Sequence, residues 1–203
     1  MSRRSPATDL ALIAVFAALI AAVTVFVPGF NVAGSTVPIT LQTLVIGLTG
    51  LVLGPWRGFL ATLLYLVIGF AGLPVFAQGA AGLSVLRRGS AGYLLSFPIY
   101  ALVVGALAYA YLRRGRAGNP VRAAIALVLA GIIGSILIVH PMGIVGMDMN
   151  IANMSFGAAV KADRLYWPGD LVKTVVAALV ALAVHRAFPW LSLGRSSVSV
   201  TNR

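Results

Sequence analysis

Residues 10–27 read LALIAVFAALIAAVTVFV, and no charged side chain occurs between Leu10 and Trp56. Because an α-helix crosses the hydrocarbon core of a bilayer with about 20 apolar residues, this uncharged stretch is long enough for two crossings. The composition of the whole chain agrees, since 60% of its 203 residues are hydrophobic and 9% are charged. A soluble domain carries about 25% charged residues. We therefore predict an all-α integral membrane protein.

Six transmembrane helices are expected from the apolar runs and from the polar or Pro/Gly-rich breaks between them. The predicted spans cover residues 10–27, 38–53, 59–70, 91–112, 123–139 and 168–184. Pro38 falls in a first helical turn, where its missing N–H would have no helical partner. No small-residue cleavage site follows the first run, so we expect a retained helix rather than a signal peptide. The expected organisation is a single membrane domain over residues 1–203 with a basic cytoplasmic tail at 186–203.

The formal charge of +11 could suggest a nucleic-acid partner. The basic residues lie between the apolar runs, however, and cytoplasmic segments of membrane proteins are enriched in Lys and Arg. With the N-terminus inside, the inner segments hold ten basic residues and the outer loops hold four, namely Arg87, Arg88, Lys161 and Arg164. We therefore expect a multi-pass protein of the bacterial cytoplasmic membrane, with both termini cytoplasmic and no nucleic-acid partner.

The three outer loops, at residues 28–37, 71–90 and 141–167, are long and rich in Gly, Asn, Gln and Met. Because long loops without regular structure are commonly functional, we interpret them as walls and a lid over a pocket. The alternative is that they only connect helices. The acids Asp148 and Asp163 are expected to be solvated in the last loop. His140 could be a proton relay or a metal ligand, but it is expected to cap helix carbonyls.

Two charged side chains, Asp170 and Lys173, lie in the sequence PGDLVK (residues 168–173), which opens the last apolar run. A charge at the bilayer centre costs about 2.5–3.5 kcal/mol on insertion scales, so charged residues in such segments commonly line a cavity or pathway. Three residues apart on a helix, the two side chains share one face and can pair. We predict that they bind a ligand near the external surface. The alternative is a helix-capping acid beside a lysine that extends outward.

Gln42 and Thr43 are weaker candidates, because an unpaired amide just inside a span would be costly. They either bind the ligand or hydrogen-bond a neighbouring helix. No metal site is expected, since no His, Cys, Asp or Glu pair has suitable spacing and the chain has no cysteine. No cofactor is expected, and ATP hydrolysis through a Gly-x-x-x-x-Gly-Lys-Ser/Thr loop is excluded. An intramembrane enzyme is disfavoured, because the spans offer no second acid or nucleophile beside Asp170.

Six short motifs occur in order along the chain: VPITLQTL (37–44), LGP (53–55), LLYL (63–66), GLPVF (72–76), GYLLSFP (92–98) and PGDLVK (168–173). Together they closely resemble the BioY family, the biotin-specific substrate-capture subunits (S components) of energy-coupling factor (ECF) transporters. The resemblance runs over about residues 10–185. Two stretches depart from it: RRGSA (87–91) stands where Gly-Pro-Thr-Gly is usual, and Tyr166-Trp167 stands where Pro-Phe is common.

The resemblance implies a six-helix S component that binds biotin from the outer face. It also implies partners, a transmembrane coupling subunit and two ATPase subunits. Biotin has a urea and an acid tail, so Asp170 could accept a bond from a urea N–H while Lys173 donates to the urea oxygen or the carboxylate. Tyr93 and Phe76 could stack on the bicyclic ring, although aromatic residues also form belts at the membrane interface. The outer loops add Gln78, Asn150 and Asn153 as candidates.

Small residues at Ala14, Ala18 and Ala22 repeat with a spacing of four in the first span. In lipid such a stripe lets another helix approach closely. The stripe could serve packing within the bundle, but the resemblance favours contact with the coupling subunit. A second hypothesis is a self-sufficient transporter of biotin or another small vitamin that needs no ATPase module. It would act as a homo-oligomer, with small residues such as Gly131 and Gly134 packing its copies together.

Overall fold

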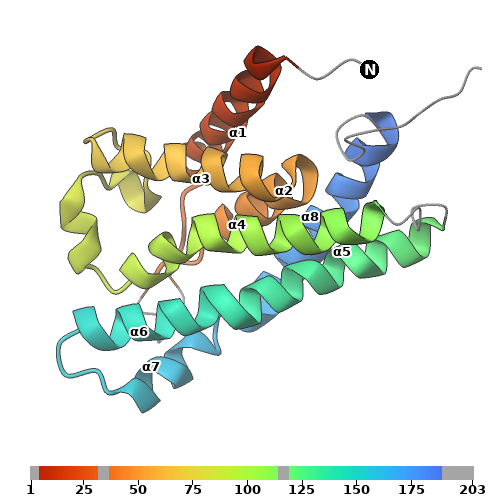
Figure 1. Cartoon of the computed structure of the whole chain (residues 1–203). Helices are drawn as coiled ribbons and strands as arrows, with labels where there is room; N and C mark the ends of the chain where they lie inside the picture. The colour runs from red at the N-terminus through yellow and green to blue at the C-terminus, as the bar shows by residue number, and fades with distance from the viewer. Residues whose placement is uncertain (1–4, 32–36, 114–118, 189–203) are drawn as a thin grey trace, which may run out of the picture.

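The structure, a computed structural model, describes residues 5–31, 37–113 and 119–188. The described chain is helical, which confirms the predicted all-α fold (Figure 1). Two short 3₁₀ turns, Ala77–Gly79 and Leu83–Arg87, lie between the third and the fourth helix. The helices are α1 (Pro6–Phe26), α2 (Gln42–Leu53), α3 (Pro55–Phe70), α4 (Ala91–Leu112), α5 (Pro120–Gly134), α6 (His140–Asn150), α7 (Phe156–Asp163) and α8 (Trp167–Ala187). Most of the expected basic tail, residues 189–203, lies outside the described residues.

Four helical segments of the described chain are long and apolar enough to cross a membrane: α1, α4, the continuous run of α5 and α6, and α8. Helices α2 and α3 are shorter but also apolar. The outer faces of α1, the α5–α6 run and α8 carry exposed large hydrophobic side chains such as Leu10, Leu137 and Val172, as expected for surfaces that meet lipid rather than water. The protein is therefore a multi-pass membrane protein.

Helix α2 begins at Gln42 and not near residue 38 as predicted. Phe30 and Ile39 exchange backbone hydrogen bonds of 3.0 and 2.8 Å, which keep the chain before the helix extended. The hydroxyl of Thr40 then accepts the backbone N–H of Gln42 at 3.3 Å. This satisfies one of the unpaired donors at the start of the helix. Pro38 consequently lies before α2, where it lines the pocket described below.

The helix that begins at Pro120 continues to Asn150, so the predicted end of the fifth span at residue 139 is wrong. A proline normally interrupts a helix, because it lacks an N–H and its ring collides with the carbonyl four residues earlier. Here Ser135–Val139 forms a π turn, in which the N–H of His140 bonds to the carbonyl of Ser135. The wider turn carries the helix past Pro141. The predicted loop at 141–167 is accordingly mostly helical, because it contains most of α6 and all of α7.

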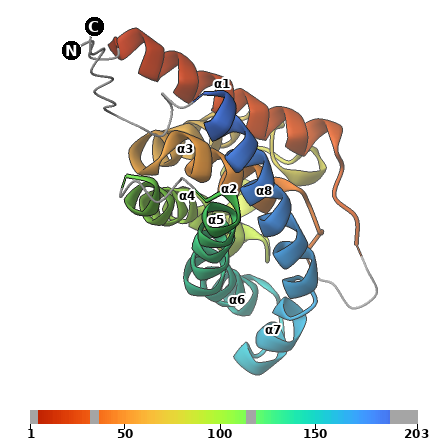
Figure 2. The ribbon, with the colours of Figure 1, turned by 90° about the vertical axis from the view of Figure 1, so that its right-hand side faces the viewer.

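Helix α4 lies at the centre of the bundle, with α2 and α3 on one side and the α5–α6 run on the other (Figure 1). Helix α8 packs against α2 and α5, and α1 lies across α3 (Figure 2). Helices α4 and α6 approach closely at Gly92 and Gly146, where a Cβ on either glycine would collide with the backbone of the other helix. The start of α4 is thereby held against α6 at the end of the bundle where α8 begins.

Candidate ligand-binding site

The main pocket lies where the segment before α2, the 3₁₀ turns, the start of α4 and the start of α8 meet. It encloses about 670 Å³ of empty space, its open mouth included. Apolar and aromatic side chains form most of its wall, with a few polar groups among them. The lining residues are Val37, Pro38, Ile39, Thr40, Gln42, Thr43, Phe76, Ala77, Ala80, Val85, Arg88, Ser90, Tyr93, Leu94, Phe97, Tyr166, Asp170 and Lys173.

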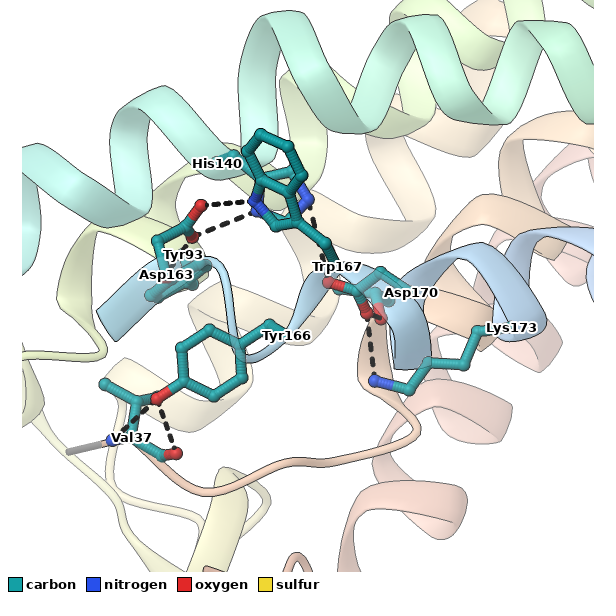
Figure 3. A network of polar contacts seen from close by, with 9 residues as sticks. Val37, Tyr93, His140, Asp163, Tyr166, Trp167, Asp170 and Lys173 are labelled. Carbon is teal, nitrogen blue, oxygen red and sulfur yellow. Dashed lines mark hydrogen bonds and ion pairs between the residues drawn. The ribbon is translucent and has the colours of Figure 1, made fainter. Parts of the chain in front are cut away.

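Asp170 and Lys173 form an ion pair in the wall of the main pocket (Figure 3). The Nζ of Lys173 donates to Oδ1 of Asp170 at 2.9 Å, and Oγ1 of Thr43 on α2 donates to the same oxygen at 2.9 Å. Asp170 is 7% exposed, so its negative charge is largely removed from water and depends on these partners. It also lies in the first turn of α8, where the helix macrodipole favours an acid by about 0.3–1 kcal/mol. The predicted pairing is thus confirmed.

A second acid, Asp163, lies next to this pair and is completely buried, so the expectation of a solvated loop acid is wrong. It ends α7, and three side chains from other elements bond to its carboxylate (Figure 3). The Tyr93 hydroxyl donates to Oδ1 at 2.6 Å, and Nε1 of Trp167 donates to Oδ2 at 2.7 Å. The third is His140, whose Nδ1 lies 3.0 Å from Oδ1. These bonds compensate the buried carboxylate.

His140 also approaches the Asp170–Lys173 pair, because its Nε2 lies 3.9 Å from Oδ2 of Asp170. The histidine side chain therefore stands between two carboxylates, and the expectation that it caps helix carbonyls is wrong. Its ring tilts against the indole of Trp167, with 5.7 Å between the ring centroids. Despite this clustering, the described residues contain no group of three or more His, Cys, Asp or Glu arranged to hold a metal ion.

Gln42 and Thr43 both line the pocket, and both bond to side chains of other helices. Nε2 of Gln42 donates to the Tyr65 hydroxyl on α3 at 2.8 Å, and that hydroxyl donates to the carbonyl of Val75 at 3.0 Å. Phe76 packs edge-on against the Tyr65 ring, with the ring centroids 5.5 Å apart. The amide predicted to be costly if unpaired is therefore satisfied, and it anchors the segment that carries Phe76.

Tyr166 fastens the segment before α2 to the start of α8. Its hydroxyl accepts the backbone N–H of Val37 at 3.1 Å and donates to the carbonyl of the same residue at 3.0 Å (Figure 3). Its ring packs edge-on against Tyr93, with 5.9 Å between the centroids. Tyr93 lines the pocket as predicted from the motif GYLLSFP, and the two tyrosines form one continuous aromatic wall.

Three predicted candidates, Gln78, Asn150 and Asn153, do not line the main pocket among the described residues. Gln78 and Asn153 are exposed, and Nδ2 of Asn150 donates to the carbonyl of Gly146 on its own helix at 3.0 Å. Other lining residues, among them Arg88 and Tyr166, are not among the candidates predicted from the sequence. The only signal for these two was that each lies in a stretch that departs from the family motifs.

A second cavity, with about 820 Å³ of empty space when its open mouth is included, lies between α5 and α8, on the other side of Asp170. Its wall is mainly apolar and includes Ile136, Leu171 and Thr174. His140 and Trp167 line this cavity, and Asp170 lines both cavities. The contact between His140 and Asp170 therefore lies in the wall that separates the main pocket from the second cavity.

Comparison with known proteins identifies the family. The BioY family model matches residues 1–190. The chain is 35% identical over 183 residues to the biotin transporter BioY of Rhizobium etli, covering 90% of this chain and 96% of that protein. It is 39% identical over 195 residues to the biotin transporter BioY of Rhodobacter capsulatus, covering 92% and 98%. Its fold matches the 2.1 Å crystal structure of the S-component for biotin from an ECF-type ABC transporter. That match has a TM-score of 0.76 and 22% identity, covering 92% of this chain and 95% of the other. This chain belongs to the BioY family.

Proposed function

We propose that this protein captures biotin in the main pocket and carries it across the membrane as the substrate-binding subunit of an ECF-type transporter. The names of the relatives and the S-component fold support this proposal. The observation that carries it is the Asp170–Lys173 ion pair in the wall of a largely apolar pocket, where Nζ of Lys173 lies 2.9 Å from Oδ1 of Asp170.

The chemistry of the pocket suits a urea that is fused to an apolar bicycle and linked to an acid tail. The free lone pairs of Asp170 can accept a urea N–H, and the spare N–H donors of Lys173 can reach the urea oxygen or the carboxylate. Phe76, Phe97 and Tyr93 supply aromatic surface for the bicycle. Arg88 is a second cation in the lining, so the wall holds two cations and one anion and favours a ligand with a negative charge.

The partner surface that we propose is the outward face of α1. Ala14 and Ala18 are exposed and Ala22 is partly exposed, whereas Ala17 and Ile20 face the core. The small-residue stripe at Ala14, Ala18 and Ala22 is thus not buried by packing inside the described bundle. Because small residues in lipid let two helices approach closely, it suits a transmembrane coupling subunit that works with two ATPase subunits. The charge distribution supports an orientation with both termini in the cytoplasm and the main pocket opening outward.

The packing of Gly131 and Gly134 weighs against the alternative, a homo-oligomer that transports without ATPase subunits. Both glycines are buried, and a Cβ on either would collide with Thr174 or with Val104. These small residues therefore pack the inside of the bundle, where they cannot join two copies. Measuring biotin uptake in cells that make this chain with and without the ATPase subunits decides between the two hypotheses. Uptake that needs only this chain would overturn the ECF proposal.

Equilibrium binding to the purified protein in nanodiscs tests the proposed ligand. We expect saturable binding of labelled biotin, competition by desthiobiotin, which keeps the urea and the acid tail, and no competition by thiamine. A protein that ignores biotin, or that binds thiamine equally well, would contradict the proposal.

Tryptophan substitution on α1 tests the proposed partner surface. Ala14→Trp combined with Ala18→Trp is expected to abolish co-purification with the coupling subunit while biotin binding is kept. The matched control is Val15→Trp with Leu19→Trp, which places the same bulk at exposed positions of α1 beside the stripe. Intact co-purification of the alanine variant, or equal loss in both variants, would count against this surface.

A further inference from the structure

His140 lies between two buried carboxylates that belong to different helices. Its Nδ1 is 3.0 Å from Oδ1 of Asp163 at the end of α7, and its Nε2 is 3.9 Å from Oδ2 of Asp170 at the start of α8. The histidine itself is 5% exposed. It reaches this position from the π turn, where its own N–H bonds to the carbonyl of Ser135. The ring is thus supplied by the α5–α6 run, while both acids come from the elements that follow (Figure 3).

The hydrogen-bonding chemistry fixes where the protons of the ring belong. An ionised carboxylate only accepts hydrogen bonds, so Nδ1 must carry the proton that bonds to Asp163. In a neutral ring Nε2 would then present a lone pair to the second carboxylate, which is unfavourable. A protonated Nε2 turns the same approach into an attraction between opposite charges. Since each ring nitrogen faces a carboxylate oxygen, the arrangement favours the doubly protonated imidazolium.

The charges of the cluster lead to the same conclusion. Among the described residues, the charged or titratable groups around His140 are Asp163 from α7, Asp170 and Lys173 from α8, and Tyr93 from α4. With a neutral imidazole these groups sum to a charge of −1 in a nearly dry site, and with an imidazolium they sum to zero. Buried charges are tolerated when they are compensated. His140 is therefore the fourth charge of this cluster, beside Asp163, Asp170 and Lys173.

We propose that His140 is a positioning residue of the ligand site, whose imidazolium holds the Asp170 carboxylate toward the pocket and couples biotin binding to the uptake of a proton. This inference rests on the proposed function, because it takes biotin as the ligand. His140 lines the second cavity and not the main pocket, so it acts on the ligand through Asp170. An anionic ligand adds a negative charge beside Lys173. The bound state consequently holds the proton on His140 more firmly than the free state does.

Linkage gives the sign of the effect. A ligand that favours the protonated form binds more tightly as the pH falls, and the protein takes up protons when it binds. The acid tail of biotin stays ionised down to about pH 5, so its own charge does not change over the range tested. The affinity for biotin is therefore expected to rise from pH 8.5 to pH 6, by at most about tenfold per pH unit for one coupled proton. Biotin amide, which lacks the charge, is expected to show a smaller slope.

The decisive variant is His140→Asn, which keeps a neutral N–H donor for Asp163 but cannot carry a charge. We expect it to bind biotin about tenfold more weakly at pH 6, with a flat pH profile, and to lose most of the difference at pH 8.5. The matched control is His185→Asn. His185 is the other histidine of the chain, and its Nε2 donates to the carbonyl of Leu51, away from the main pocket. This control is expected to keep the slope of the wild-type protein.

Calorimetry of the wild-type protein provides a measurement that does not depend on folding of the variant. Binding heats in two buffers with different ionisation enthalpies give the number of protons exchanged, and uptake is expected near pH 7. Zero exchange, or a His140→Asn variant that keeps the wild-type slope, would overturn the proposal while the proposed function stands. Absence of biotin binding at every pH would instead overturn the proposed function and this inference together.

Discussion

Replacing Asp170 by asparagine removes one negative charge from the pocket wall without changing the shape of the side chain. In the native protein Oδ1 of Asp170 accepts from Lys173 and from Thr43, each at 2.9 Å, and in the proposed complex the carboxylate also accepts a urea N–H. A hydrogen bond to a charged group contributes about 1.5–3 kcal/mol. At about 1.4 kcal/mol for each factor of ten, Asp170→Asn is expected to weaken biotin binding by about 10- to 150-fold.

The same substitution also leaves the Lys173 ammonium, whose side chain is 12% exposed, without its counter-charge. Breaking one partner out of a buried pair costs about 3–5 kcal/mol, whereas removing both charges together is often close to neutral. The single variant is therefore expected to lose stability, and the double variant Asp170→Asn with Lys173→Met to recover most of it. Binding should not recover with it, because the asparagine offers the urea N–H only a neutral acceptor.

Titration calorimetry in nanodiscs and thermal unfolding of the same samples separate the two effects. Asp148→Asn is the matched control, because it makes the same chemical change on α6, outside the lining of the main pocket. Wild-type affinity in Asp170→Asn, or affinity that returns with stability in the double variant, would refute the argument that this acid recognises the ligand.

Three further predictions concern the rest of the pocket. Arg88→Ala is expected to weaken binding of biotin about tenfold, and binding of the neutral biotin amide much less, in competition assays. Arg87→Ala, which lies outside the lining, is the control, and equal losses for both ligands would contradict the role of Arg88 in charge recognition. Tyr166→Phe removes both hydrogen bonds to the backbone before α2 and is expected to lower the affinity for biotin about three- to tenfold, mainly through faster dissociation in stopped-flow measurements. An unchanged dissociation rate would show that these two bonds do not help to retain the ligand. Gly69→Ala places a Cβ against the Phe76 ring, so it is expected to cost about 1–3 kcal/mol of stability and to reduce biotin binding. A thermal unfolding midpoint equal to that of the wild-type protein would show that the ring can move freely.

Contacts between residues close together in the sequence could be predicted from the sequence alone. Asp170 and Lys173 are one helical turn apart, so their pairing followed from spacing alone. The bond between Thr43 and Asp170 joins residues 127 positions apart, and no local pattern predicts it. The motif resemblance brought both residues to one site without showing that they touch.

The errors had physical causes as well. The predicted loop at 141–167 places Asp163 in solvent, but its side chain points inward from the end of α7, where polar groups of Tyr93, His140 and Trp167 meet it. Because Pro141 follows it, His140 is predicted from the sequence to stand at the end of a helix. The π turn absorbs that proline, and such turns leave no clear signature in composition or periodicity.

The length of the α5–α6 helix gives the depth of the charged cluster. Twenty residues separate Pro120 from His140, which at 1.5 Å per residue is about 30 Å, the thickness of the hydrocarbon layer. With Pro120 at one boundary of that layer, the imidazole and both acids stand at the opposite boundary, and the last turns of α6 rise among the lipid head groups. In the proposed complex, a vitamin that arrives from solution thus loses its hydration shell at the edge of the bilayer, without entering the hydrocarbon interior.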